Sequence, residues 1–155
     1  MHRRDFFRRV LENAVLVPAL LSWPLSASPL LAAWSQSAFR EQDFAKSTRA
    51  VFGDTPIEES PEVQLELPKQ RENGSVVPLE ISSTLQGVEL FALFIEQNPT
   101  PLAGIYKFRK RTLPFISTRI KVVEGDAVHV VVVAKAGSRL YKTSGRVKII
   151  IGGCD

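Results

Sequence analysis

From residue 63 onwards, apolar and polar residues alternate in short segments, and this period of two constrains the fold more than any other feature. Residues 63–67 read Val-Gln-Leu-Glu-Leu and stop at Pro68, the pattern of a strand with one buried face. About seven short strands with frequent turns predict an all-β fold, an immunoglobulin-like antiparallel β-sandwich over residues 62–151. The other expected strands are residues 75–83, 87–96, 102–108, 115–123, 128–135 and 147–151.

Turn residues separate these segments. Asn73-Gly74 is the strongest turn signal, and further turns are expected at residues 98–101, 124–126 and 136–138. Pro78 lies inside an expected strand and lacks a backbone N–H, so that strand should be at a sheet edge or bulge there. Residues 130–133 and 149–151 are apolar without alternation, so both faces of these strands should be covered. This apolar excess predicts a heterodimer with a second small sandwich subunit.

A short helix is expected before the sandwich. Residues 37–52 place phenylalanines and valine near helical spacing, with Ser37 able to cap the helix and Gly53 able to end it. Residues 54–61 contain two prolines and should form a linker. The helix and linker together occupy residues 34–61.

Residues 1–33 have the composition of an export signal. Arg3 and Arg4 begin a basic segment, and no charged residue occurs from 13 to 39. The paired arginines indicate the twin-arginine route and a periplasmic destination. Three prolines interrupt the apolar run, which argues against a membrane anchor. Ala33 is the expected last leader residue, with Ala27 as the alternative.

The charge balance excludes one class of partner. Without residues 1–33, Lys and Arg fall from 20 to 16 and Asp and Glu from 16 to 14, so the net charge falls from +4 to +2. The high isoelectric point therefore belongs partly to the leader, and nothing in the composition favours a nucleic-acid partner.

The sequence reaches its single cysteine, Cys154, directly after a strand-like run and two glycines. Gly152 and Gly153 should act as a hinge, because glycine adopts many backbone conformations. The four residues past Ile151 span at most roughly 13 Å. A thiol on this flexible arm at residues 152–155 could enter a pocket on another protein. Alternatively, Cys154 is an incidental residue in a frayed terminus. The residues alone leave both interpretations open.

Few other residues could carry chemistry. His129 is the only histidine outside the leader and Met1 the only methionine, so this chain alone cannot build a blue-copper site or a four-ligand zinc site. No cofactor or metal is expected. A Cys154–His129 dyad is formally possible, but the valine-rich surroundings of His129 favour an ordinary strand position.

One basic cluster has two interpretations. Lys107, Arg109, Lys110 and Arg111 could form a docking patch for an acidic partner or an anionic substrate. We favour the other interpretation, a solvated strand end and loop.

Several motifs in order resemble the SoxY family, the sulfur-compound carriers of bacterial thiosulfate oxidation. The leader resembles the family's twin-arginine signal, and the helix ending at Gly53 is in the family's place. Glu-Asn-Gly-Ser-Val-Val-Pro at residues 72–78, Asn-Pro-Thr-Pro-Leu at 98–102 and Ser-Thr-Arg-Ile-Lys at 117–121 are similar to family motifs. The most specific is Ile-Gly-Gly-Cys at residues 151–154.

The resemblance implies a carrier rather than an enzyme, with Cys154 as the point of covalent substrate attachment. SoxY pairs with a second sandwich subunit, SoxZ. The c-type cytochrome SoxAX conjugates thiosulfate oxidatively to the terminal cysteine, and the hydrolase SoxB releases sulfate. A sulfur dehydrogenase takes part where it is present.

One departure bears on these partners. The family ends in Gly-Gly-Cys-Gly-Gly, whereas Asp155 follows the cysteine here. A divergent carrier paired with a different oxidoreductase is the nearest variation on the family's function. Two other functions compete with the carrier. One is an exported sandwich adaptor with an incidental thiol. The other, a thiol redox enzyme, would need a Cys-x-x-Cys pair.

Overall fold

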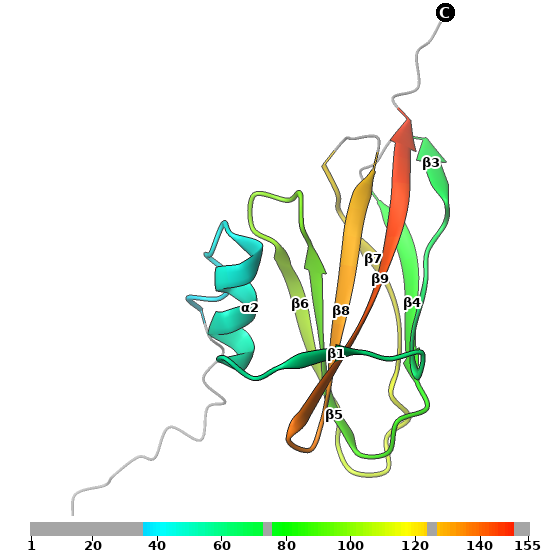
Figure 1. Cartoon of the computed structure of the whole chain (residues 1–155). Helices are drawn as coiled ribbons and strands as arrows, with labels where there is room; N and C mark the ends of the chain where they lie inside the picture. Colours follow the sequence, from blue (N-terminus) through cyan, green and yellow to red (C-terminus); the bar gives the residue numbers. More distant parts are fainter. Residues whose placement is uncertain (1–35, 73–75, 124–126, 151–155) are drawn as a thin grey trace, which may run out of the picture. The chain divides into compact units, whose positions relative to one another are not determined.

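The computed structural model describes residues 36–72, 76–123 and 127–150 (Figure 1). The expected turns at 73–74 and 124–126 lie outside these residues, as do the leader and the C-terminal arm. Within the described residues, one helix precedes nine strands. The elements are α2 (Phe44–Phe52), β1 (Ile57–Glu59), β2 (Val63–Glu66), β3 (Gln70–Glu72), β4 (Val77–Ser83), β5 (Val88–Ile95), β6 (Leu102–Lys107), β7 (Phe115–Ile120), β8 (Val128–Ala136) and β9 (Arg139–Ile150).

The strands form two sheets, and the predicted immunoglobulin-like β-sandwich is confirmed. The larger sheet has the order β1-β9-β8-β5-β6, and β3 pairs with the far end of β9; the smaller sheet has the order β2-β4-β7. Antiparallel pairing dominates, while β1 and β3 each run parallel to β9. Strand β9 therefore connects three neighbours and leads towards the C-terminal arm (Figure 1).

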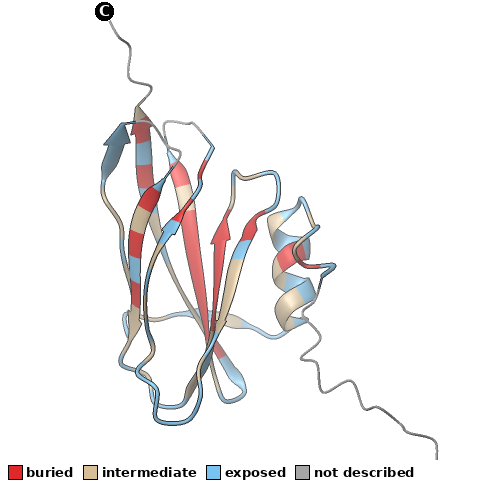
Figure 2. Cartoon of the chain, turned by 180° about the vertical axis from the view of Figure 1, so that it is seen from behind, coloured by how far each residue is buried: buried red, intermediate tan, exposed pale blue. Residues whose placement is uncertain are grey.

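The core between the two sheets comes from the inward face of each alternating strand. Val63, Leu79 and Ile81 from the small sheet meet Phe91 and Leu93 from the large sheet. The buried residues run along the strands between exposed loops (Figure 2). Burial of one face explains why the period of two predicted these strands.

A second apolar cluster lies on the outer face of the large sheet, under α2. Val131 and Val133 of β8 and Phe94 of β5 are buried there. The ring of Phe44, from α2, meets Phe94 edge-on with centroids 5.5 Å apart. The chain's own helix therefore covers the outer face of the apolar run in β8. A second subunit is not needed to explain that run.

The helix is shorter than predicted, because Asp43 rather than Ser37 caps it. The Asp43 carboxylate accepts a hydrogen bond from the Lys46 N–H at 2.8 Å, as an N-cap residue should. The Ser37 carbonyl instead accepts from the N–H groups of residues 40 and 41, in a separate turn. The predicted end is confirmed, since Gly53 adopts φ 67° and donates to the Arg49 carbonyl.

Three strand segments differ from the sequence prediction. The expected linker contains β1, and β3 was not predicted at all. Strand β9 begins at Arg139 instead of residue 147, and pairs along its length with β8. These segments were missed because their residues are mostly polar, and backbone pairing rather than an apolar pattern holds them.

Two special residues in the strands have clear positions. Pro78 lies in β4, the middle strand of its sheet, whereas an edge or bulge position was expected. Pairing with β2 has ended at Glu80, however, so only β7 runs beside Pro78. A Cβ atom at Gly145 would lie 2.8 Å from a methyl group of Leu67. The segment that contains Leu67 passes this close to β9, which explains why residue 145, in the middle of a strand, is a glycine.

The other expected turns are present where the structure describes them. Gly137 adopts φ 61° between β8 and β9. At the turn after β5, the Asn98 side chain accepts from the Val123 N–H at 3.1 Å and donates to the Lys121 carbonyl at 3.0 Å. Asn98 therefore joins the β5–β6 turn to the segment that follows β7.

Candidate functional site

The predicted attachment residue, Cys154, and its hinge residues Gly152 and Gly153 lie outside the described residues. The structure describes the chain up to Ile150, the end of β9. The structure therefore describes the end of β9, to which the arm is attached, and the residues that hold this end in place.

Strand β3 holds the end of β9 in place. Gln70 pairs with Lys148 and Glu72 with Ile150 in a parallel register. The Lys148 N–H also donates to the Lys69 carbonyl at 3.0 Å. Backbone pairing with β3 restricts Lys148 and Ile150 at the end of β9. The arm therefore starts from a fixed position rather than from a frayed one.

The hydrophobic core anchors the same segment from the other side. Val147 is fully buried and Ile149 is 3% exposed, both within the cluster between the sheets. The last described residue, Ile150, therefore follows directly after a core residue, Ile149. Four residues from Ile150 to Cys154 span at most about 13 Å, which limits the region the thiol can reach.

The end of the sandwich from which the arm leaves carries basic and apolar side chains. Arg71 on β3 and Arg146 on β9 lie near the end of β9, together with Lys148 and the acidic Glu72, which pairs with Ile150. Val76, before β4, is 50% exposed and Val123, after β7, is 37% exposed. Such a surface suits contact with an anionic group and with another protein.

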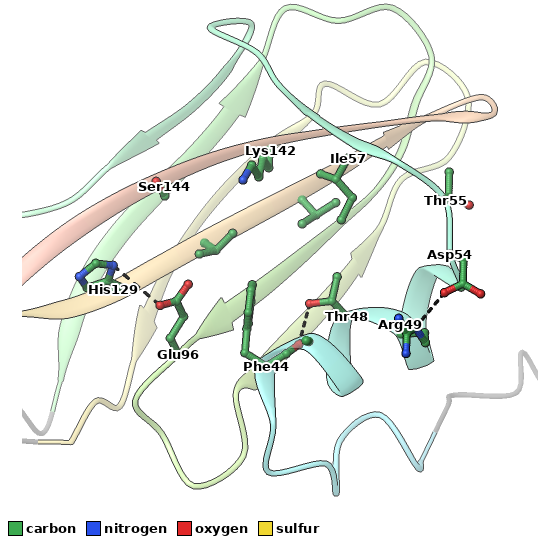
Figure 3. Close-up of a pocket in the computed structure, with 14 residues that line it drawn as sticks. Phe44, Thr48, Arg49, Asp54, Thr55, Ile57, Glu96, His129, Lys142 and Ser144 are labelled. Carbon is green, nitrogen blue, oxygen red and sulfur yellow. Dashed lines mark hydrogen bonds and ion pairs between the residues drawn. The ribbon is translucent and has the colours of Figure 1, made fainter.

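A groove lies on the outer face of the large sheet, between α2 and strands β8 and β9 (Figure 3). Its volume is about 460 Å³, and Phe44, Ile57, Val131 and Val133 supply its apolar part. Most of its polar side chains bond to each other or to the backbone. The pairs are Arg49–Asp54 at 2.8 Å, His129–Glu96 at 3.8 Å, Lys142–Glu59 at 3.4 Å and Thr48 with the Phe44 carbonyl at 2.8 Å.

His129 lies in this groove and is part of the regular strand structure. Its backbone N–H donates to the Gln97 side chain at 2.8 Å, and its carbonyl accepts from the Glu96 N–H at 3.1 Å. The imidazole Nδ1 faces the Glu96 carboxylate. These contacts agree with an ordinary strand position for His129. Cys154 lies outside the described residues, so the Cys154–His129 dyad stays untested.

The described residues contain neither a group of metal ligands nor a helix that could span a membrane. In residues 36–72, 76–123 and 127–150, no group of three or more His, Cys, Asp or Glu side chains could hold a metal ion. No helix in that part of the chain is long and apolar enough to cross a membrane.

The basic cluster lies at the other end of the sandwich from the arm. Arg109, Lys110 and Arg111 are exposed in the loop between β6 and β7. The register places this loop beside the start of β5, since Lys107 pairs with Leu90. Lys107 ends β6 and the other three cations lie in an exposed loop, a placement that is compatible with both interpretations of the cluster.

Sequence reasoning missed the support of the arm by β3. The residues Gln70, Arg71 and Glu72 are all polar and exposed, so no periodicity marks them as a strand. The one sequence feature that pointed to a strand here was its position just before the expected turn at Asn73-Gly74.

The comparisons with known proteins agree with this architecture. A family model described as "Sulfur oxidation protein SoxY" matches residues 48–154, from within α2 to the cysteine. The solved sulfur carrier protein SoxY from Chlorobium limicola f thiosulfatophilum is 30% identical, with a TM-score of 0.63. That match covers 69% of this chain and 96% of the carrier.

Weaker structural matches add nothing to the argument. A chain from a structure of T cell activation by toxic shock syndrome toxin-1 is 11% identical, with a TM-score of 0.42 over 57% of this chain and 99% of that chain. A lytic polysaccharide monooxygenase from Jonesia denitrificans is 9% identical, with a TM-score of 0.41 over 53% of this chain and 57% of that one. No curated protein sequence matches the chain.

Proposed function

Because the chain belongs to the SoxY family of sulfur oxidation proteins, we propose that it carries sulfur intermediates of thiosulfate oxidation covalently on Cys154. The observation that supports this most is the fixed end of β9. A core residue and a paired strand hold the chain up to Ile150, and the family match continues to the cysteine. A rigid body followed by two glycines and a thiol is a suitable arrangement for delivering a substrate to several partners.

The proposed cycle begins with an oxidation. The Cys154 thiol loses its proton, and its sulfur forms an S–S bond with the outer sulfur of thiosulfate. Two electrons leave to a c-type cytochrome. A hydrolase then adds water at the sulfonate group, which departs as sulfate and leaves a persulfide on Cys154. The carrier's own part in both steps is to present the sulfur atom.

Two features of the chain favour this role. First, the narrow arm can enter a partner's pocket while the sandwich stays outside, because glycines have no side chains to block a tunnel. Second, Arg71, Arg146 and Lys148 outnumber Glu72 near the end of β9, so the charge there is positive. Positive charge there attracts thiosulfate and stabilises an anionic adduct on the thiol.

The carrier is proposed to act with partners rather than as an enzyme. These are a SoxZ-like sandwich subunit in a heterodimer, a c-type cytochrome and a sulfate-releasing hydrolase. Export by the twin-arginine route would place the protein in the periplasm with them. The outer face of β8 beneath α2 is already covered, so the second subunit should bind elsewhere on the sandwich.

Substitution of the thiol tests the proposal. The Cys154→Ser variant should fold normally and lose thiosulfate-dependent electron flow to the cytochrome. Its unfolding free energy should change by less than about 0.5 kcal/mol, because the last core residue of the described chain is Ile149 and the thiol follows five residues later. Electron flow at the native rate through the variant would mean that Cys154 does not carry the substrate.

A further inference from the structure

The loop between β6 and β7 presents three consecutive cations, Arg109, Lys110 and Arg111, to solvent. It faces the loop between β4 and β5, and the two loops enclose a hollow of about 670 Å³. Hydroxyl and amide side chains of the opposite loop line this hollow together with the cations. These lining residues include Ser83, at the end of β4, and Thr84 and Gln86 of the loop.

The loop is held firmly at both ends. Phe108 packs edge-on against Phe91 in the core, with ring centroids 4.9 Å apart, and its N–H donates to the Glu89 carbonyl at 2.8 Å. At the other end, the Pro114 carbonyl accepts from the Ser83 N–H at 3.1 Å. These contacts fix the backbone at both ends of the loop, which lowers the backbone entropy lost when a partner binds.

Arg111 has an unusual backbone conformation. Its φ is 70°, and it is the one non-glycine residue with positive φ among the described residues. This left-handed conformation is unfavourable for a residue with a side chain, and glycine would adopt it without strain. A strained residue at an exposed, charged loop calls for a reason other than stability.

The cations of this loop have no carboxylate partner among the described residues. The salt bridges found there do not include Arg109, Lys110 or Arg111. Glu89, the acidic residue that lines the hollow, pairs with Lys135 at 3.5 Å. The hollow therefore presents an uncompensated positive charge.

Apolar side chains adjoin this charge. Leu113 is 81% exposed and Phe115 is 50% exposed, directly after the cations. A small inorganic anion would gain nothing from them. Apolar side chains beside arginines are instead typical of protein interfaces, where aromatic residues and arginine are enriched.

We propose that the β6–β7 loop, with Arg109, Lys110, Arg111, Leu113 and Phe115, is a docking surface for an acidic, partly apolar surface of a partner protein. Charge complementarity selects the partner's acidic residues. The exposed leucine and phenylalanine supply the apolar contact.

The position of this surface separates it from the arm. Strand β9 runs from Arg139, at the end where the β6–β7 loop lies, to Ile150 at the other end (Figure 1). Eleven steps along the strand span about 36 Å. The arm, reaching about 13 Å, cannot extend to a partner's active site there. On the proposed carrier function, a protein docked here would stay bound while the arm visits other partners.

Binding of a labelled synthetic peptide to the full chain tests the docking surface. The peptide has glutamates around one leucine and one phenylalanine, and a matched peptide has glutamines instead. The double reversal Arg109→Glu with Lys110→Glu should weaken binding of the acidic peptide about tenfold. The control reversal Arg119→Glu with Lys121→Glu, at two exposed cations of the other end, should change it less than about twofold. High salt should weaken binding of the acidic peptide to the native chain.

Further measurements distinguish the alternatives. Leu113→Ser should also weaken binding, and the glutamine peptide should bind poorly. Equal losses in the two double reversals would refute the proposal, because attraction would then be general. Displacement by millimolar sulfate, with no effect of Leu113→Ser, would also refute it and indicate a small-anion site. The Cys154→Ser variant should bind the peptide normally, so failure here and failure of the carrier function are distinguishable.

Discussion

The packing of α2 on the large sheet can be tested through one aromatic pair. Phe94 of β5 is fully buried, and Phe44 of α2 meets it edge-on at 5.5 Å. Removal of a buried phenylalanine costs about 3–5 kcal/mol, so Phe94→Ala should lower the free energy of unfolding by about 4 kcal/mol. Phe44 is only half buried, and Phe44→Ala should cost about 2 kcal/mol.

The double variant isolates the contact between helix and sheet. Edge-to-face pairs contribute about 0.5–1.5 kcal/mol beyond area burial. The loss of unfolding free energy in the double variant should therefore be smaller than the sum of the losses in the two single variants, by about 1 kcal/mol. Urea denaturation followed by circular dichroism measures all four proteins. The control is the Phe91–Phe108 pair inside the sandwich, which should couple similarly.

A coupling of zero between Phe44 and Phe94, with coupling retained in the control pair, would refute the reasoning. The outer face of β8 would then lack its cover, and the apolar run of Val131 and Val133 would again require a second subunit. The same measurement thus decides how the apolar excess in β8 is to be explained.

Three further predictions concern the cap, the strained loop and the arm. Asp43→Ala should lower the unfolding free energy by about 1 kcal/mol through loss of the helix cap, whereas Asp54→Ala, at an exposed ion pair, should lower it less; urea titrations that rank them in the opposite order would contradict the cap. Arg111→Gly should raise the thermal midpoint slightly through relief of the left-handed strain, and a lower midpoint would show that the Arg111 side chain stabilises the loop. Replacing Asp155 by Gly-Gly should speed alkylation of Cys154 by iodoacetamide, because a neighbouring carboxylate disfavours the thiolate; equal rates at low salt would mean that Asp155 affects partner fit instead.

The parts of the fold that sequence could predict are the strands that bury apolar side chains. Residues 63–67 were recognisable because burial of one face demands apolar side chains at every second position, and residues 128–135 because burial of both faces gives a continuous apolar run. The helix was recognisable for the same reason, and its end because Gly53 adopts a conformation that suits glycine. The start of the helix was not, since Ser37 and Asp43 are both chemically suitable caps and only the fold selects between them.

The support of the candidate site is the part that sequence could not predict. Strand β3 has no apolar residue and is held by pairing with β9. The polar first half of β9 likewise depends on its neighbours β8 and β1. Backbone hydrogen bonding is available to every residue type, so it leaves no pattern in the sequence. The cysteine after two glycines, in contrast, could be singled out from the residues alone.

The central claim is that Cys154 carries sulfur covalently, and intact-mass spectrometry tests it most directly. The full-length protein would be purified without reductant from cells grown on thiosulfate, beside the Cys154→Ser variant. The native protein should carry sulfur adducts that map to the peptide containing Cys154 and that dithiothreitol removes, while the variant should carry none. An unmodified native protein, or adducts of equal mass on the variant, would contradict the claim.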